Sequence, residues 1–155
     1  MLAMGFLEAV AKRIPTVDVD LVGVTNRSCY RCGRQGVAIA GVLVDPLMAN
    51  ALIGVKDDLF LDFELVGEAV RQAVDPVWLR EHFIGPLKVR TSRPRPEGYM
   101  SNGCHSCDAI IGTSPLREAV EKIGIARLRE FVIGSASVPL DALSEAVNGV
   151  KLEWS

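Results

Sequence analysis

The sequence predicts one α+β domain in which a small antiparallel sheet lies near two cysteine pairs, with a helical insertion between the pairs and helices toward the C-terminus. Three observations predict this class. The chain has 155 residues, about the length of one domain. Its 49% hydrophobic and 23% charged residues are typical of a globular chain and exclude disorder for its bulk. Short Val- and Ile-rich runs also alternate with helical patterns.

Two expected strands and a helix occupy the first half of the chain. Residues 18–26 alternate in part and predict a strand, and residues 35–44 lack a polar stripe, which suits a strand covered on both faces. Asp57-Asp58 is interpreted as a solvated turn or a helix cap. Apolar residues at helical spacing then predict a helix that covers residues 65–74.

Proline and glycine mark the element ends in the second half. Asp75-Pro76 predicts the start of a short helix over 77–83, followed by a strand at 87–92 and a Pro-rich turn at 93–98. The later expected elements are a helix that starts at Ser114-Pro115 and stops at Gly124, a strand at 131–133, a helix from Pro139 and an edge strand at 150–154.

The sequence favours a cytoplasmic protein without a membrane segment. Residues 6–14 predict an amphipathic helix ended by Pro15, and their positive charges follow the apolar start, the reverse of a secretory signal. The longest apolar stretch, 36–55, contains Asp45-Pro46 and is interpreted as a buried strand, a turn and a second apolar segment. In the cytoplasm, cysteine pairs bind metals or act in catalysis more often than they form disulfides.

All four cysteines fall in two Cys-x-x-Cys pairs, Cys29/Cys32 and Cys104/Cys107. Two intervening residues allow a tight turn to aim both thiolates at one ion, and two such pairs complete the tetrahedron typical of structural Zn²⁺. The same four thiolates also bind iron, so an iron site remains the second metal hypothesis.

The residue after each pair fits such a turn. Gly33 follows Cys32 and accepts the positive φ that the turn needs. Asp108 follows Cys107 and tolerates that conformation less well than Gly but better than most residues.

Residues 28–33 and 102–108 resemble the knuckles of zinc-ribbon, or rubredoxin-like, metal-binding proteins. Residues 98–107 are also similar to the second knuckle of some uncharacterised bacterial zinc-ribbon proteins, a likeness that carries no activity with it. In that group the two Cys-x-x-Cys pairs are usually closer together in the sequence. The 71 residues between Cys32 and Cys104 therefore imply a split ribbon. The implied parts are a ribbon at 19–44 and 87–112, a helical insertion at 57–86 and a C-terminal α/β segment at 114–155.

Thiol–disulfide chemistry at Cys104/Cys107 is the alternative function, because Cys-His-Ser-Cys has the spacing of oxidoreductase sites. In thiol–disulfide oxidoreductases, the Cys-x-x-Cys motif follows a buried strand and lies at the start of a helix. Here the pair follows a Pro-rich turn and Asn-Gly, and Thr113-Ser114-Pro115 delays the helix. Thiol–disulfide chemistry at Cys104/Cys107 would also leave the first pair, Cys29/Cys32, without a function.

The two histidines do not add a convincing catalytic site. His105, between the second pair, is expected to be an exposed knuckle residue, and His82 a surface or half-buried structural residue. No Ser/His/Asp order, Gly-rich phosphate loop or carboxylate pair at a convincing spacing occurs. The sequence therefore leans away from an enzyme, and no small-molecule substrate is inferred.

The formal net charge of −2 conceals an asymmetry. Segments 27–36 and 86–107 together carry +6, and the remainder carries −8. The functional interpretation is a basic, Tyr-bearing face near the metal that contacts nucleic acid or an acidic protein surface. The alternative is that these cations only balance the thiolates. The candidate residues are Tyr30, Arg31, Arg34, Lys88, Arg90, Arg93, Arg95 and Tyr99.

Overall fold

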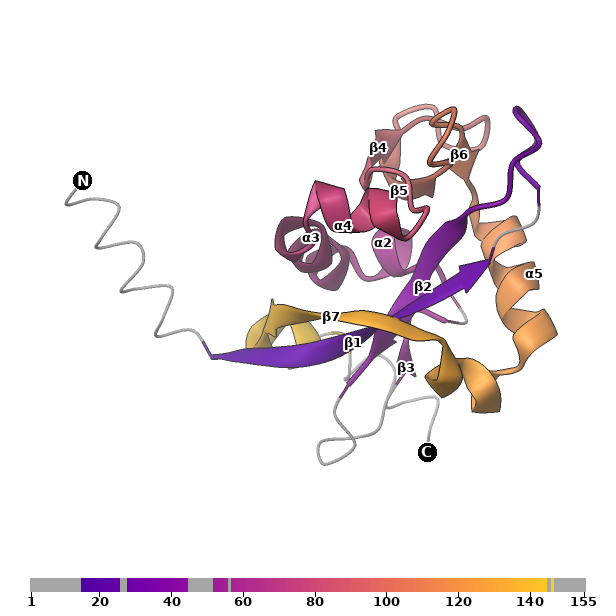
Figure 1. Ribbon diagram of the computed structural model, residues 1–155. Coiled ribbons are helices and arrows are strands. Elements are labelled where there is room, and N and C mark those ends of the chain that lie inside the picture. The colour runs from indigo at the N-terminus through magenta and orange to yellow at the C-terminus, as the bar shows by residue number, and fades with distance from the viewer. Residues whose placement is uncertain (1–14, 26–27, 45–51, 56, 145, 147–155) are drawn as a thin grey trace.

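The computed structural model describes residues 15–25, 28–44, 52–55, 57–144 and 146, which form two antiparallel sheets with helices around them (Figure 1). The larger sheet has the strand order β3-β2-β1-β7, and the smaller has the order β4-β5-β6. The strands are β1 (Thr16–Thr25), β2 (Val37–Leu43), β3 (Leu52–Ile53), β4 (Lys88–Arg90), β5 (Tyr99–Gly103), β6 (Ile110–Ile111) and β7 (Val132–Pro139). The predicted α+β class with antiparallel sheets is confirmed.

Helices lie both between the cysteine pairs and after them, as the sequence predicts. Those between the pairs are α2 (Leu59–Asp62), α3 (Glu64–Ala73) and α4 (Pro76–Glu81). Those after the second pair are α5 (Thr113–Ile123), the 3₁₀ helix η1 (Ile125–Phe131) and the helical residues 140–144 and 146.

The larger sheet is covered on both faces, because β1 and β2 alternate between two hydrophobic clusters. Leu21 and Ile39 face the cluster formed with α2, α3 and α4. Val22 and Ala38 face the cluster formed with α5 and η1. A register irregularity between Val22 and Gly23 adjusts the pairing of the two strands. The expectation of a strand covered on both faces is confirmed for β2, whose residues from Ala38 to Leu43 are all buried.

Side-chain caps fix two helix starts near the predicted positions. Asp58 accepts hydrogen bonds from the backbone N–H groups of Phe60 and Leu61, and Asp75 accepts one from Val77. Asp58 is a cap, but it is buried rather than solvated. The expectation for α5 was wrong by two residues, because Gly112 is its N-cap and Ser114 lies inside the helix.

Two strands differ from the expectation. The prediction has no strand at 99–103, where β5 lies, and it ends the strand of β7 at residue 133 instead of 139. Both segments are rich in small and polar residues, a composition shared with turns. Pairing decides their conformation, since β7 pairs with β1 from Thr16↔Pro139 to Val22↔Val132.

Some expectations fall on residues outside the described ranges, namely the helix at 6–14 and the edge strand at 150–154. Within the described ranges, none of the helices combines the length and the hydropathy needed to span a bilayer.

Candidate metal centre

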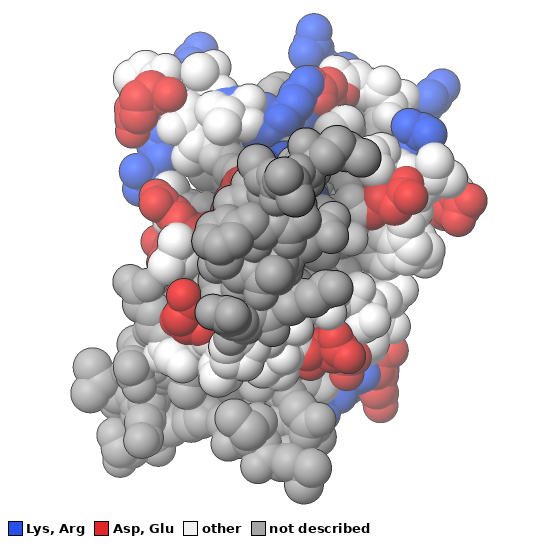
Figure 2. All heavy atoms as spheres, turned by 90° about the vertical axis from the view of Figure 1, so that its left-hand side faces the viewer, with Lys and Arg blue, Asp and Glu red and all other residues white. Residues whose placement is uncertain are grey.

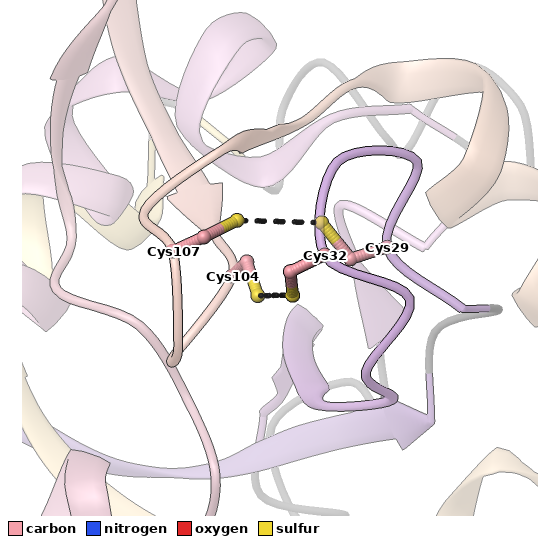
Figure 3. Close-up of side chains that lie close together, drawn as sticks. All are labelled: Cys29, Cys32, Cys104 and Cys107. Carbon is pink, nitrogen blue, oxygen red and sulfur yellow. Dashed lines mark hydrogen bonds between the residues drawn. The ribbon is translucent and has the colours of Figure 1, made fainter.

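The four cysteine side chains converge on one point from two loops (Figure 3). Cys29 and Cys32 lie in the loop between β1 and β2, and Cys104 and Cys107 lie in the loop between β5 and β6. All four Sγ atoms are within 4.8 Å of one another. Two cross-loop distances, from Cys29 Sγ to Cys107 Sγ and from Cys32 Sγ to Cys104 Sγ, are both 3.6 Å.

These distances fit a metal tetrahedron better than disulfides. Four sulfurs at about 2.3 Å from a central Zn²⁺ stand about 3.8 Å apart, close to the two 3.6 Å separations. A disulfide would bring two sulfurs to about 2.05 Å, and all four cysteines are free. The cluster is therefore a group that can hold one metal ion.

The two loops share one backbone hydrogen-bond pattern. In the first loop the N–H of Gly33 donates to the carbonyl of Cys29 at 2.8 Å, and in the second the N–H of Asp108 donates to that of Cys104 at 3.0 Å. Gly33 and Asp108 also share a left-handed backbone, with φ of 79° and 67°. We call these loops knuckle 1 (residues 29–34) and knuckle 2 (residues 104–109).

The first cysteine of each knuckle has a lowered pKa. Burial raises the pKa of Cys29, but the N–H groups of Cys32 and Arg31 and the neighbouring thiols outweigh burial and lower this pKa to about 7. Burial likewise raises the pKa of Cys104, and the N–H groups of Cys107 and Ser106 lower it further than burial raises it.

The raised pKa of Cys107 shows why a cation would stabilise the cluster of thiols. The N–H of Ala109 lowers its pKa, yet burial and the three neighbouring sulfurs outweigh that hydrogen bond and raise the pKa to about 11. Four thiolates within 4.8 Å repel one another strongly. A divalent cation at their centre removes this repulsion and keeps all four deprotonated.

Arg90 contacts knuckle 2 through hydrogen bonds to Asp108. Its guanidinium group is buried and donates to the carbonyls of Ser101 and Pro86, both at 2.7 Å. It also donates to the Asp108 carboxylate at 2.6 Å, and Lys88 forms an ion pair with the same carboxylate. Partial burial raises the pKa of Asp108, but these two cations outweigh burial and hold it below its usual value.

Asn102 joins the two sheets beside the centre. Its buried side chain accepts a hydrogen bond from the N–H of Ile39 in β2 at 2.9 Å and donates to the carbonyl of Ile39 at 3.0 Å. The amide thus pairs with β2 as another strand would. Sequence reasoning missed this residue, because an Asn before Gly is a common turn signal.

The candidate residues of the predicted basic face come from separate parts of the chain. Tyr30, Arg31 and Arg34 lie on knuckle 1, whereas Arg93 and Arg95 precede β5 and Cys104 follows it. About 13 Å of strand therefore separates those two arginines from knuckle 2. The half-buried Tyr99 begins β5 at that far end as well. In Figure 2, most Lys and Arg side chains of the visible face lie at its upper end, where Figure 1 places β4 to β6.

The cations also differ in their partners. Lys88 and Arg90 are bound to Asp108, so Arg90 is not available to an external partner, contrary to the expectation from sequence. Arg34 donates to Ser106 at 2.8 Å and so connects the two knuckles. The side chains of Arg31, Arg93 and Arg95 are exposed and form no hydrogen bond or ion pair with the residues that the structure describes.

The histidines lie outside the sulfur cluster. His105 is half-buried rather than exposed; its ring packs edge-on against Phe83 with centroids 5.6 Å apart, and its Nδ1 is buried with no hydrogen-bond partner in the described part of the chain. His82 is half-buried, stacks on Trp78 and lies 2.8 Å from the Trp78 carbonyl through Nδ1. This placement agrees with the structural role predicted for His82.

Comparison with known proteins adds no family. No protein-family model, curated protein or solved structure matches the chain.

Proposed function

We propose that this chain is a non-enzymatic binding module organised by one structural Zn²⁺, with Cys29, Cys32, Cys104 and Cys107 as ligands. One observation carries the proposal: four free thiols from two knuckles of matched backbone geometry lie within 4.8 Å of one another. A closed four-thiolate set leaves no open position for a substrate, which is the arrangement of structural rather than catalytic zinc. The split zinc ribbon is the fold type that this site supports best.

Metal content tests the proposal. We expect about one zinc per purified chain, and four thiols that react with a thiol reagent only after a chelator is added. Cobalt substitution should give the intense visible bands of tetrahedral thiolate coordination. Cys32→Ser should lose these bands, whereas Ser106→Ala, an exposed residue of knuckle 2, should retain them. A folded chain without metal would refute the zinc site, and bound iron would identify the rubredoxin-like alternative.

We further propose that knuckle 1 is the part of this module that contacts a nucleic acid. Tyr30 is 77% exposed. The side chain of Arg31 is exposed and forms no hydrogen bond or ion pair with the described residues, and Arg34 is exposed as well. An exposed aromatic ring next to guanidinium groups suits stacking on a base together with phosphate contacts. Lys88 and Arg90 balance Asp108 instead, so the contact is smaller than the sequence suggests.

The separation of the arginines provides a matched control for this contact. Fluorescence anisotropy with single-stranded and duplex oligonucleotides at low salt should show binding that Tyr30→Ala/Arg31→Gln weakens about tenfold or more. Arg93→Gln/Arg95→Gln, at the other end of β5, should weaken it less. The affinity should fall as salt rises. No binding to either oligonucleotide would favour an acidic protein as the partner.

Thiol–disulfide catalysis is less well supported. Cys104 is buried, and no helix begins at Cys107, since α5 starts at Thr113. The pair does follow a buried strand end, which the sequence did not predict. A thiol titration that finds a cycling disulfide in the presence of zinc would revive this alternative.

A further inference from the structure

A cavity of about 260 Å³ lies beside knuckle 2, between the ends of α3 and α4 and the segment that leads into β4. His105 lines it, so the cavity adjoins the metal centre without including any cysteine. The proposed functions above use neither the cavity nor the arginines at its edge.

The interior of the cavity is apolar. Leu79, Ile84 and Leu87 line it, and all three side chains are buried. Such a surface favours the apolar body of a ligand over a multiply charged group, whose desolvation would be costly. The volume of about 260 Å³ lies just below the range of roughly 300–1,000 Å³ usual for ligand pockets, so the cavity suits a small ligand.

Two guanidinium groups give the edge of the cavity a positive charge. Arg71 and Arg80 both line it. Arg71 is already paired with Glu68, which balances much of its charge. Arg80 is exposed, and its guanidinium group forms no hydrogen bond or ion pair within the described ranges. An anionic group placed between them would therefore be held mainly by Arg80, whose planar fork fits a carboxylate with two parallel hydrogen bonds.

We propose that this cavity binds a small organic monocarboxylate, with its apolar body on Leu79, Ile84 and Leu87 and its carboxylate on Arg80. His105 forms part of the wall, and its ring is fixed by Phe83 on one side and by the close backbone of Gly36 on another. The ligand therefore contacts a residue of knuckle 2. The inference does not depend on nucleic-acid binding by knuckle 1.

Phenylacetate is a suitable probe, because it joins one ring to one carboxylate. Titration of the zinc-loaded chain, followed by two-dimensional amide NMR, should give saturable shifts in α4, residues 84–87 and knuckle 2, with a Kd on the order of 1 mM. Phenylacetamide lacks the charge and acetate lacks the apolar body, so both should bind at least tenfold more weakly.

Variants test the assignment of the carboxylate. Arg80→Gln should weaken phenylacetate about tenfold, as expected for loss of one charge-assisted contact, and Arg71→Gln should have a smaller effect. Arg117→Gln, an exposed arginine of α5 that does not line the cavity, should leave binding unchanged. Zinc content in each variant reports whether the fold is retained. Absence of saturable shifts, equal binding of phenylacetamide, or equal effects of Arg80→Gln and Arg117→Gln would overturn the proposal.

Discussion

A single buried guanidinium group stabilises the left-handed conformation of Asp108 in knuckle 2. Arg90 has four carbonyls and one carboxylate within hydrogen-bond distance, and one of these partners, Asp108, has a φ of 67°. The left-handed conformation is unfavourable for a residue with a side chain. The two cations that hold the Asp108 side chain offset that cost, whereas Gly33 adopts the same conformation freely in knuckle 1.

Replacing Arg90 should therefore destabilise the protein more than replacing its exposed neighbour in the same cluster. Arg90→Met leaves buried carbonyls without a donor, and we expect a loss of about 3 kcal/mol in the free energy of unfolding. Lys88→Met removes an exposed ion pair and should cost less than about 1 kcal/mol. Urea unfolding of the zinc-loaded variants measures both. Equal losses would show that Arg90 has no special structural role.

The sequence indicated the conformation at Asp108 but not the role of Arg90. The knuckle turn is local, so the positions after each cysteine pair were predictable from spacing alone. The partners of Arg90 come from Pro86, Ser101 and Asp108, which only the fold brings together. For that reason the sequence alone places Arg90 among the candidate residues of the basic face.

Strand β5 connects the two sheets through the side chain of Asn102 instead of through a ladder of backbone hydrogen bonds. Asn102 bonds both polar groups of the Ile39 backbone, which are buried in β2. This contact lies directly before knuckle 2, since Gly103 and Cys104 follow Asn102. It therefore helps to align the β5–β6 loop with the β1–β2 loop.

Asn102→Ala should misalign the knuckles as well as reduce stability. It leaves the N–H and the carbonyl of Ile39 buried without partners, which we expect to cost about 2–4 kcal/mol. Ser101→Ala is the matched control, because the Ser101 hydroxyl makes only long contacts of 3.4 and 3.5 Å among the described residues. Chemical denaturation gives the stability, and competition with a zinc indicator gives the affinity. Unchanged zinc affinity in a folded Asn102→Ala would contradict the aligning role.

Across the whole molecule, the metal centre joins two sheets whose strands lie far apart in the sequence. Knuckle 1 belongs to the four-stranded sheet and knuckle 2 to the three-stranded sheet. Metal binding at such a junction contributes directly to the free energy of folding, with apparent values on the order of 10 kcal/mol. A metal ion bound by the four cysteines would thereby stabilise the arrangement of both sheets together.

Removal of zinc should therefore loosen both sheets and not one loop alone. We expect a chelator to lower the melting temperature markedly and to reduce the amide protection of β1, β2 and β5 together. Cys32→Ser and Cys104→Ser, one in each knuckle, should reproduce this loss and show no further change on chelation. Retention of the melting temperature after complete zinc removal would contradict the structural role of the metal.

The sequence alone specifies the four cysteines of the candidate metal centre, the α+β class and most helix positions. These depend on local spacing, on caps such as Asp58 and Asp75, and on the periodicity of apolar residues. Only the tertiary structure decided the extent of β7, the strand at β5 and the division of the cations into bound and free groups. Those features depend on pairing and burial between distant residues, so no local pattern specifies them. The cavity beside His105 likewise exists only because α4 and knuckle 2 meet.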